Sequence, residues 1–139
     1  MSERQELFVL VVASDRVVAA TVASVLRAGG YLAATVASNA AVPSIAARMV
    51  VDAAVIDLPP GHPLDVQTAV ILQNRYPNCR IVFVCSPPQR DEAVMLAEET
   101  SLDCEFVLRP LSRAELLAQM AVAPGVSNPQ SRARQPQAA

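Results

Sequence analysis

The sequence contains no lysine and no tryptophan, and its only aromatic residues are two tyrosines and three phenylalanines among 139 residues. All 11 basic residues are therefore arginines, and they are scattered along the chain without forming a cluster. Because nucleic-acid binding needs a basic patch or stripe, we expect no nucleic-acid partner. The formal net charge of -2 is too small to indicate any partner by electrostatics.

The sequence also lacks the marks of secretion and of disulfide bonding. Its first residues, MSERQELF, are charged and carry no apolar signal segment, so we expect neither secretion nor a membrane span. The three cysteines, Cys79, Cys85 and Cys104, are odd in number and have no metal-ligand spacing. They lie in or near apolar runs, where free cysteine acts as a small hydrophobic side chain. A reduced, cytoplasmic setting is therefore expected.

Apolar residues make up 53% of the sequence and fall into short runs separated by turn signals. Continuous apolar, β-branched runs are typical of strands buried on both faces of a parallel sheet. Such runs predict strands over residues 8–12, 31–36, 51–58, 81–85 and 105–108. Apolar residues at helical spacing predict one helix capped by Ser14 or Asp15 and stopped at Gly29, and others over residues 38–49, 64–76, 89–100 and 112–122.

Three local signals refine the expected helix starts. Asp65 is predicted to cap the third helix. Ser112 and Glu115 have the spacing of a capping box at the start of the last helix. The proline pair at residues 87–88 is expected to close the fourth strand, so that the fourth helix follows it.

Strands that alternate with helices predict right-handed crossovers and a five-stranded parallel sheet with helices on both faces. The expected strand order is 2-1-3-4-5, the flavodoxin-like α/β arrangement, with a crevice at the carboxyl edge where the order reverses. We expect an N-terminal extension over residues 1–6 and one domain over residues 7–123. Residues 124–139 have no apolar period and are rich in Pro, Gln, Ser and Ala, so a disordered tail is expected there.

Polar residues follow four of the predicted strands, and parallel strands that are linked in this way end at one edge of the sheet. These residues are Ser14 and Asp15 after the first strand, Asp57 after the third, Cys85 and Ser86 after the fourth, and Arg109 after the fifth. In open α/β sheets this edge is where ligands bind. The alternative is that Asp57 caps its own loop or forms an ion pair with Arg109 across the edge.

This order and spacing resemble the receiver domain of bacterial response regulators, the CheY-like family, over residues 7–122. In that family the third strand ends in an aspartate that accepts a phosphoryl group. Asp57, in the segment VIDLPPG, matches that position. The resemblance therefore implies that Asp57 is a phosphoacceptor.

The fourth and fifth strands carry the rest of the resemblance. The family's fifth strand has an aromatic residue, two apolar residues and then Lys-Pro, and FVLRP keeps every element except the lysine, with Phe106 as the aromatic residue and Arg109 in the lysine position. The hydroxyl residue that ends the fourth strand in the family aligns with Cys85, and Ser86 comes one residue later. The resemblance implies that these four residues face the phosphoryl group or move when it binds.

The resemblance also implies a Mg²⁺ ion, held by carboxylates after the first strand, by the acceptor aspartate and by a backbone carbonyl. The corresponding ligands would be Asp15, Asp57 and the carbonyl of Pro59. The usual acidic pair falls on Ala13 and Ser14, neither of which is a carboxylate, and Asp15 also suits the cap of the first helix. We therefore expect Mg²⁺ binding to be weak or absent.

Two functions are consistent with this pattern. The first is a single-domain receiver-like protein of two-component phosphorelay signalling, phosphorylated at Asp57 by a histidine kinase or a phosphotransfer protein, with weakened Mg²⁺-dependent chemistry. The second is a phosphorylation-independent pseudo-receiver that acts as a protein–protein interaction module. Either would act on a downstream protein partner, and a homodimer through the fourth and fifth strand–helix units is a further expectation.

Two other classes are disfavoured by the residues. A flavin-carrying protein of this fold needs a glycine- and hydroxyl-rich phosphate loop after the first strand, and ASDRVVAA has no glycine. No acid–base pair or nucleophile–base pair is visible, so we expect no catalytic residues and no enzymatic turnover. His62, the single histidine, is expected to be a solvated loop residue.

Overall fold

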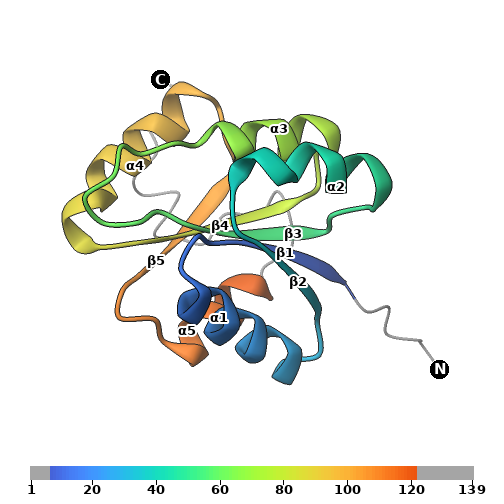
Figure 1. Cartoon of the computed structure of the whole chain (residues 1–139). Coiled ribbons are helices and arrows are strands. Elements are labelled where there is room, and N and C mark those ends of the chain that lie inside the picture. The colour runs from blue at the N-terminus through green and yellow to red at the C-terminus, as the bar shows by residue number, and fades with distance from the viewer. Residues whose placement is uncertain (1–6, 122–139) are drawn as a thin grey trace.

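The strands form one parallel sheet. The computed structural model describes residues 7–121, in which five strands lie in the order β2-β1-β3-β4-β5. They are β1 (Phe8–Val12), β2 (Leu32–Val36), β3 (Ala53–Asp57), β4 (Arg80–Cys85) and β5 (Cys104–Leu108). Every neighbouring pair is parallel, so the α/β architecture and the strand order predicted from the sequence are confirmed (Figure 1).

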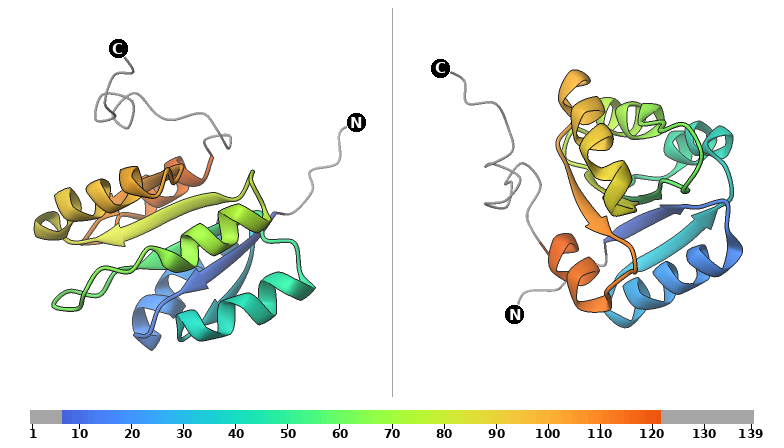
Figure 2. Two further views of the ribbon diagram at one scale, coloured as in Figure 1. Left: turned by 90° about the horizontal axis from the view of Figure 1, so that it is seen from above. Right: turned by 90° about the vertical axis from the view of Figure 1, so that its left-hand side faces the viewer.

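Helices cover both faces of the sheet (Figure 1, Figure 2). One face carries α1 (Arg16–Ala28) and α5 (Arg113–Met120); the other carries α2 (Val42–Arg48), preceded by the short 3-10 helix η1 (Asn39–Ala41), together with α3 (Gln67–Arg75) and α4 (Pro87–Glu99). None of the helices within residues 7–121 has the length and apolar content that a bilayer-spanning segment needs. The expected extension over residues 1–6, the last two residues of the expected domain and the expected tail lie outside the described residues.

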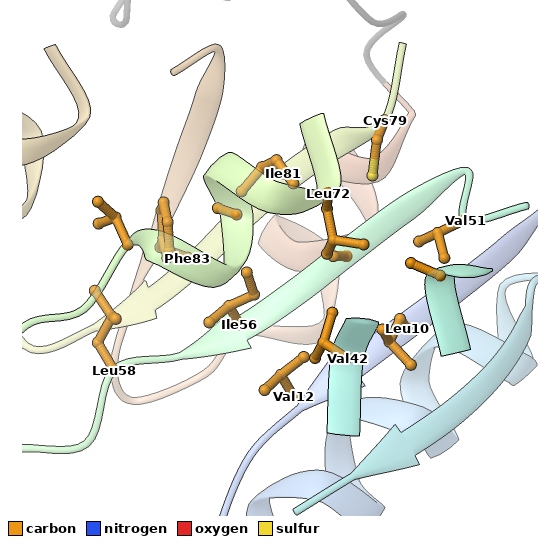
Figure 3. Packing of buried hydrophobic residues seen from close by; sticks show 14 of the residues in the cluster. Leu10, Val12, Val42, Val51, Ile56, Leu58, Leu72, Cys79, Ile81 and Phe83 are labelled. Atoms are coloured by element: carbon orange, nitrogen blue, oxygen red, sulfur yellow. The ribbon is translucent and has the colours of Figure 1, made fainter. Parts of the chain in front are cut away.

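Burial on both faces of the sheet explains the uninterrupted apolar runs. All six residues of β4 are buried, as are four of the five residues in each of β1 and β3. Towards α2 and α3, Leu10, Ile56 and Phe83 belong to one core cluster (Figure 3). Towards α1 and α5, a second cluster contains Leu26 and Leu116. The two clusters pack helices against both faces of the sheet, and this packing positions the strand ends.

Helix α4 begins two residues earlier than predicted. Pro87 and Pro88 do not merely close the fourth strand, because they form the first turn of α4. The backbone N–H of Ser86, the residue before the helix, donates to the side chain of Gln89 at 2.7 Å. Proline suits the first position of a helix, where the missing N–H has no partner to lose.

Helices α3 and α2, in contrast to α4, begin later than predicted. Asp65 is not the cap of α3, which begins at Gln67 after Val66. The Asp65 carboxylate accepts a hydrogen bond from the N–H of Gln67 at 2.9 Å, a turn contact that competes with helix geometry. The helix predicted over residues 38–49 is instead η1 followed by α2, with Pro43 in its first turn.

A buried ion pair ties β4 and β5 to α5. Arg80 and Glu105 have side chains that are 4% and 1% exposed, and Nη2 of Arg80 lies 3.8 Å from Oε2 of Glu105. Nε of Arg80 also donates to the backbone carbonyl of Gln119, in the last turn of α5, at 3.2 Å. Charges this deeply buried are tolerated only when they are paired. The apolar pattern of the two strands gave no sign of this pair.

We predict that Glu105→Leu lowers the free energy of unfolding by about 3–5 kcal/mol, because it leaves the Arg80 guanidinium buried without its carboxylate. The double variant Arg80→Met/Glu105→Leu should regain most of this loss, since apolar replacement of a whole buried pair is often neutral. Urea unfolding followed by circular dichroism measures both. A loss below about 1 kcal/mol in the single variant, the range of exposed ion pairs, would contradict the prediction.

Candidate functional site

Asp57 lies at the carboxyl edge of the sheet, the edge at which all five parallel strands end. Its Oδ1 accepts a hydrogen bond from Nη1 of Arg109 at 2.6 Å. The Asp57 side chain is 7% exposed and that of Arg109, which directly follows β5, is 22% exposed. The two residues therefore form a largely buried ion pair, the arrangement that the sequence left open as an alternative to a free acceptor.

The guanidinium of Arg109 joins three segments of the chain. Its Nη2 donates to the backbone carbonyl of Leu58 at 2.6 Å and to Oε1 of Gln89 at 2.8 Å. Its Nε donates to the hydroxyl of Ser86 at 3.3 Å. A guanidinium is a planar fork with five N–H donors, whereas a lysine ammonium is a compact point charge. Arginine can therefore bind the end of β3, the loop after it and the start of α4 together.

Gln89 is absent from the predicted site, yet it bonds to Arg109, to Ser86 and to the loop after β3. Its Nε2 donates to the carbonyls of Pro59 at 3.0 Å and of Leu58 at 3.2 Å. Its Oε1 accepts from the N–H of Ser86 as well as from Arg109. The sequence did contain a signal, because SPPQ over residues 86–89 has the S-x-x-Q spacing of a capping box.

The electrostatics of the site are dominated by burial. Burial raises the pKa of the Asp57 carboxyl above its ordinary value of 3.8, because desolvation disfavours the charged form. The Arg109 guanidinium opposes this rise through its charge and its hydrogen bond, and the carboxylate of Asp15 adds to it. The net rise in pKa means that desolvation outweighs the attraction of the nearby cation.

Asp15 acts as the N-cap of α1. Its Oδ1 accepts hydrogen bonds from the N–H groups of Val17 at 2.8 Å and Val18 at 3.2 Å, and the residue is exposed. These bonds satisfy two of the unpaired donors at the start of the helix. Asp15 still influences the pKa of Asp57 through its charge, but its hydrogen bonds belong to the helix.

The oxygen donors at this edge do not fit a divalent cation. Ala13 and Ser14 supply no carboxylate, and the carbonyl of Pro59, the expected backbone ligand, already accepts a hydrogen bond from Gln89. Nowhere in residues 7–121 do three or more His, Cys, Asp or Glu side chains form a group that could hold a metal ion. Mg²⁺ favours several hard oxygen ligands and gives up its water reluctantly. The described residues at this edge therefore lack the donor set of a Mg²⁺ site.

The predicted switch residues divide into two groups. Ser86 and Arg109 meet at the edge beside Asp57. Cys85 is fully buried, and burial raises the pKa of its thiol. Phe106 stacks on Phe83, with ring centroids 5.7 Å apart, and packs against the core on the α2–α4 side. The hydroxyl at this edge is therefore that of Ser86, one residue beyond the position that the resemblance indicates.

Comparison with known proteins identifies the fold. No family model and no curated protein matches the chain. Many solved structures do match it, and they include response-regulator receiver domains. The chain has the fold of a response-regulator receiver domain.

Three of the matching structures illustrate the likeness. The signal receiver domain of an HD domain-containing protein from Pseudomonas fluorescens has a TM-score of 0.72 at 14% identity, covering 86% of this chain and 88% of that one. The chemotaxis response regulator CheY4 of Vibrio cholerae has a TM-score of 0.71 at 14% identity, with 84% and 97% covered. A response regulator receiver protein from Sinorhizobium medicae reaches 20% identity with a TM-score of 0.67, over 83% and 91%. At these identities the likeness establishes the receiver fold alone, and the chemistry must be argued from the residues of this chain.

We predict opposite changes in the pKa of Asp57 when its two charged neighbours are neutralised. Arg109→Gln should raise the pKa further, because it removes the stabilising cation. Asp15→Asn should lower the pKa, because it removes a neighbouring negative charge. Carboxyl ¹³C chemical shifts followed through a pH titration measure both. Asp103→Asn, before β5 at the opposite edge, serves as the control and should leave the pKa unchanged.

The raised pKa also predicts a dependence of stability on pH. The folded protein holds the Asp57 proton more tightly than the unfolded chain, so this group's contribution to stability falls as pH rises from about 3.8 through the raised folded-state value. Asp57→Asn removes this fall. Urea unfolding at a series of pH values should therefore show a smaller decline in the variant across this window, and an equal or steeper decline would contradict the prediction.

Proposed function

We propose that this chain is a receiver-type signalling module that acts through protein–protein contacts and does not depend on Mg²⁺-assisted phosphorylation of Asp57. The observation that carries the proposal is the 2.6 Å ion pair between Arg109 and Asp57. In this proposal the module is not an enzyme. Its proposed place of action is the cytoplasm, since the three cysteines are free thiols.

The chemistry of phosphoryl transfer supports this reading. Transfer to a carboxylate needs the charge on the phosphoryl oxygens to be neutralised by metal ions and basic side chains. Ala13 and Ser14 supply no carboxylate that could hold such a metal ion. The Arg109 guanidinium carries the right charge, but its donors are already bound to Asp57 and to neighbouring oxygens. Asp57 is therefore proposed to be an anchor for the surrounding loops.

The proposed output surface is centred on α4. Met95 on α4 is 54% exposed. Within one helical turn of it, four exposed carboxylates surround its side chain: Asp91, Glu92, Glu98 and Glu99. A downstream partner with basic groups around an apolar pocket would complement this surface. A homodimer through the same face would bring the carboxylates of both copies together, so a different protein is the favoured partner.

A second candidate function is phosphorelay signalling with Asp57 as the phosphoacceptor. It is favoured by the position of Asp57 at the end of β3, with the Ser86 hydroxyl and the Arg109 guanidinium beside it. In that case a carboxylate oxygen attacks the phosphorus of a phosphohistidine on a kinase or phosphotransfer protein, and the P–N bond breaks. Arg109 would then turn from the carboxylate to the phosphoryl oxygens, which guanidinium groups bind well.

Acetyl phosphate with Mg²⁺, and beryllofluoride with Mg²⁺, separate the two candidates. We expect wild-type protein to show no mass increase with acetyl phosphate and no change in its amide NMR spectrum with beryllofluoride. The reason is that the carboxylate is paired and the cation ligands are missing. Asp57→Asn is the matched control, and a catalytically competent receiver treated in parallel shows that the reagents are active.

A mass increase in wild-type protein that is lost in Asp57→Asn would contradict the proposed function and support the second candidate. The same variant provides a positive test. Asparagine keeps an oxygen that can accept the hydrogen bond from Arg109, so the anchor is retained in Asp57→Asn. If the module acts through protein contacts alone, cells that carry this variant should therefore retain the proteins that co-purify with wild type. Loss of those proteins with an unchanged fold would count against the proposal.

A further inference from the structure

We propose that Gln89 is the positioning residue of the carboxyl-edge site and holds the Arg109 guanidinium on the Asp57 carboxylate that a divalent cation would need. We call Gln89 and Arg109 together the guanidinium clamp. The inference rests on the proposed function, because it explains how the module is held in one state without a bound cation. It assigns a role to Gln89, which lies outside the motifs of the sequence resemblance.

The clamp donates hydrogen bonds to three oxygens at this edge, two of which belong to residues that the resemblance assigns to a cation. Arg109 donates to Oδ1 of Asp57 at 2.6 Å and to the carbonyl of Leu58 at 2.6 Å. Gln89 donates to the carbonyl of Pro59 at 3.0 Å. These groups are the carboxylate at the end of β3 and the two backbone carbonyls that follow it. A cation entering here would have to displace N–H donors and approach a resident positive charge.

Both ends of the Gln89 amide are needed for this arrangement. Oε1 accepts from the N–H of Ser86 at 2.7 Å and from Arg109 at 2.8 Å. Nε2 donates to the carbonyls of Leu58 and Pro59. A glutamate at this position could accept hydrogen bonds but could not donate them, and an alanine could neither accept nor donate. Four hydrogen bonds therefore fix the amide in one orientation, and the amide in turn fixes the guanidinium.

The clamp also fixes the start of α4. Gln89 lies in the first turn of that helix, so its bonds to Leu58 and Pro59 tie the helix to the loop after β3. The bond from Arg109 to the Ser86 hydroxyl adds a second attachment at 3.3 Å. The proposed output surface on α4 is thus held by side chains of the protein itself, with no ligand required.

Cation binding tests the proposal directly, with Mn²⁺ as the probe. Two variants share an added carboxylate after β1, Ser14→Asp. The first keeps the clamp, and the second also carries Gln89→Ala and Arg109→Lys. We expect Mn²⁺ to broaden the amide signals of residues 57 and 58 in the second variant at a concentration about tenfold lower than in the first, the scale of effect that residues behind a metal site have on affinity.

An equal response in the two variants, whether strong or absent, would overturn the proposal, because the clamp would then not be what excludes the cation. Circular dichroism checks that each variant is folded. If the second variant does not fold, Ser14→Asp/Gln89→Ala replaces it. This variant keeps Arg109 and is expected to respond in the same direction, with the same overturning result.

Hydrogen exchange at Arg109 tests the positioning role separately. The Nε–H of Arg109 should exchange slowly with water in wild type, and Gln89→Ala should speed its exchange at least about tenfold by releasing the guanidinium. Gln73→Ala is the matched control, because Gln73 on α3 makes comparable bonds to the backbone of Cys79 and Asp103 at the opposite edge. Equal acceleration in both variants would mean general loosening and would overturn the assignment.

These outcomes are independent of the test of the proposed function. Phosphorylation of wild-type protein at Asp57 would contradict the proposed function. The clamp is judged by differences between variants in Mn²⁺ binding and in exchange at Arg109, and neither measurement involves a phosphoryl donor.

Discussion

The ion pair between Asp57 and Arg109 is the contact on which the carboxyl edge of this sheet depends. Asp57 ends a strand that is buried on both faces, so little water reaches its carboxylate, and its pKa is raised even with a cation 2.6 Å away. A carboxylate in that position needs a partner of opposite charge. The guanidinium meets this need, and its remaining donors reach the loop after β3 and the start of α4. One side chain thus balances the charge and joins segments that are far apart in the sequence.

The residues around Asp57 form one electrostatic arrangement. A lysine ammonium and a bound divalent cation together balance several carboxylates, whereas a single guanidinium balances about one. Carboxylates at positions 13 and 14 would raise the pKa of Asp57 further, as the neighbouring charge of Asp15 already does. Because positions 13 and 14 carry no carboxylate, the charge of Arg109 has no further acidic side chain to balance there, and it pairs with Asp57. Gln89 completes the arrangement with a neutral amide, which brings donors to the carbonyls without adding charge.

The sequence was most informative where the pattern is local. The five apolar runs predicted the sheet and its order, because β-branched runs between helices allow few alternatives, and the strand ends predicted that Asp57 and Arg109 lie at one edge. Gln89 was missed because Pro87 and Pro88 suggested the end of a strand, although the same residues suit the first turn of a helix. The Arg80–Glu105 pair could not be predicted, since a charge in an apolar run does not indicate which strand supplies its partner.

The energetics of the Asp57–Arg109 pair point to ordering as its main contribution. Ion pairs that are removed from water often recover in mutual attraction no more than they lose in solvation, and apolar residues of similar size often stabilise a fold as well. Apolar side chains would not orient a carbonyl, a hydroxyl and an amide relative to one another, because dispersion has no preferred direction. The guanidinium has fixed donor directions, and it selects one arrangement of the loops after β3, β4 and β5. In the proposed function, this ordering of the edge by the protein's own side chains is what would hold the α4 surface in one state.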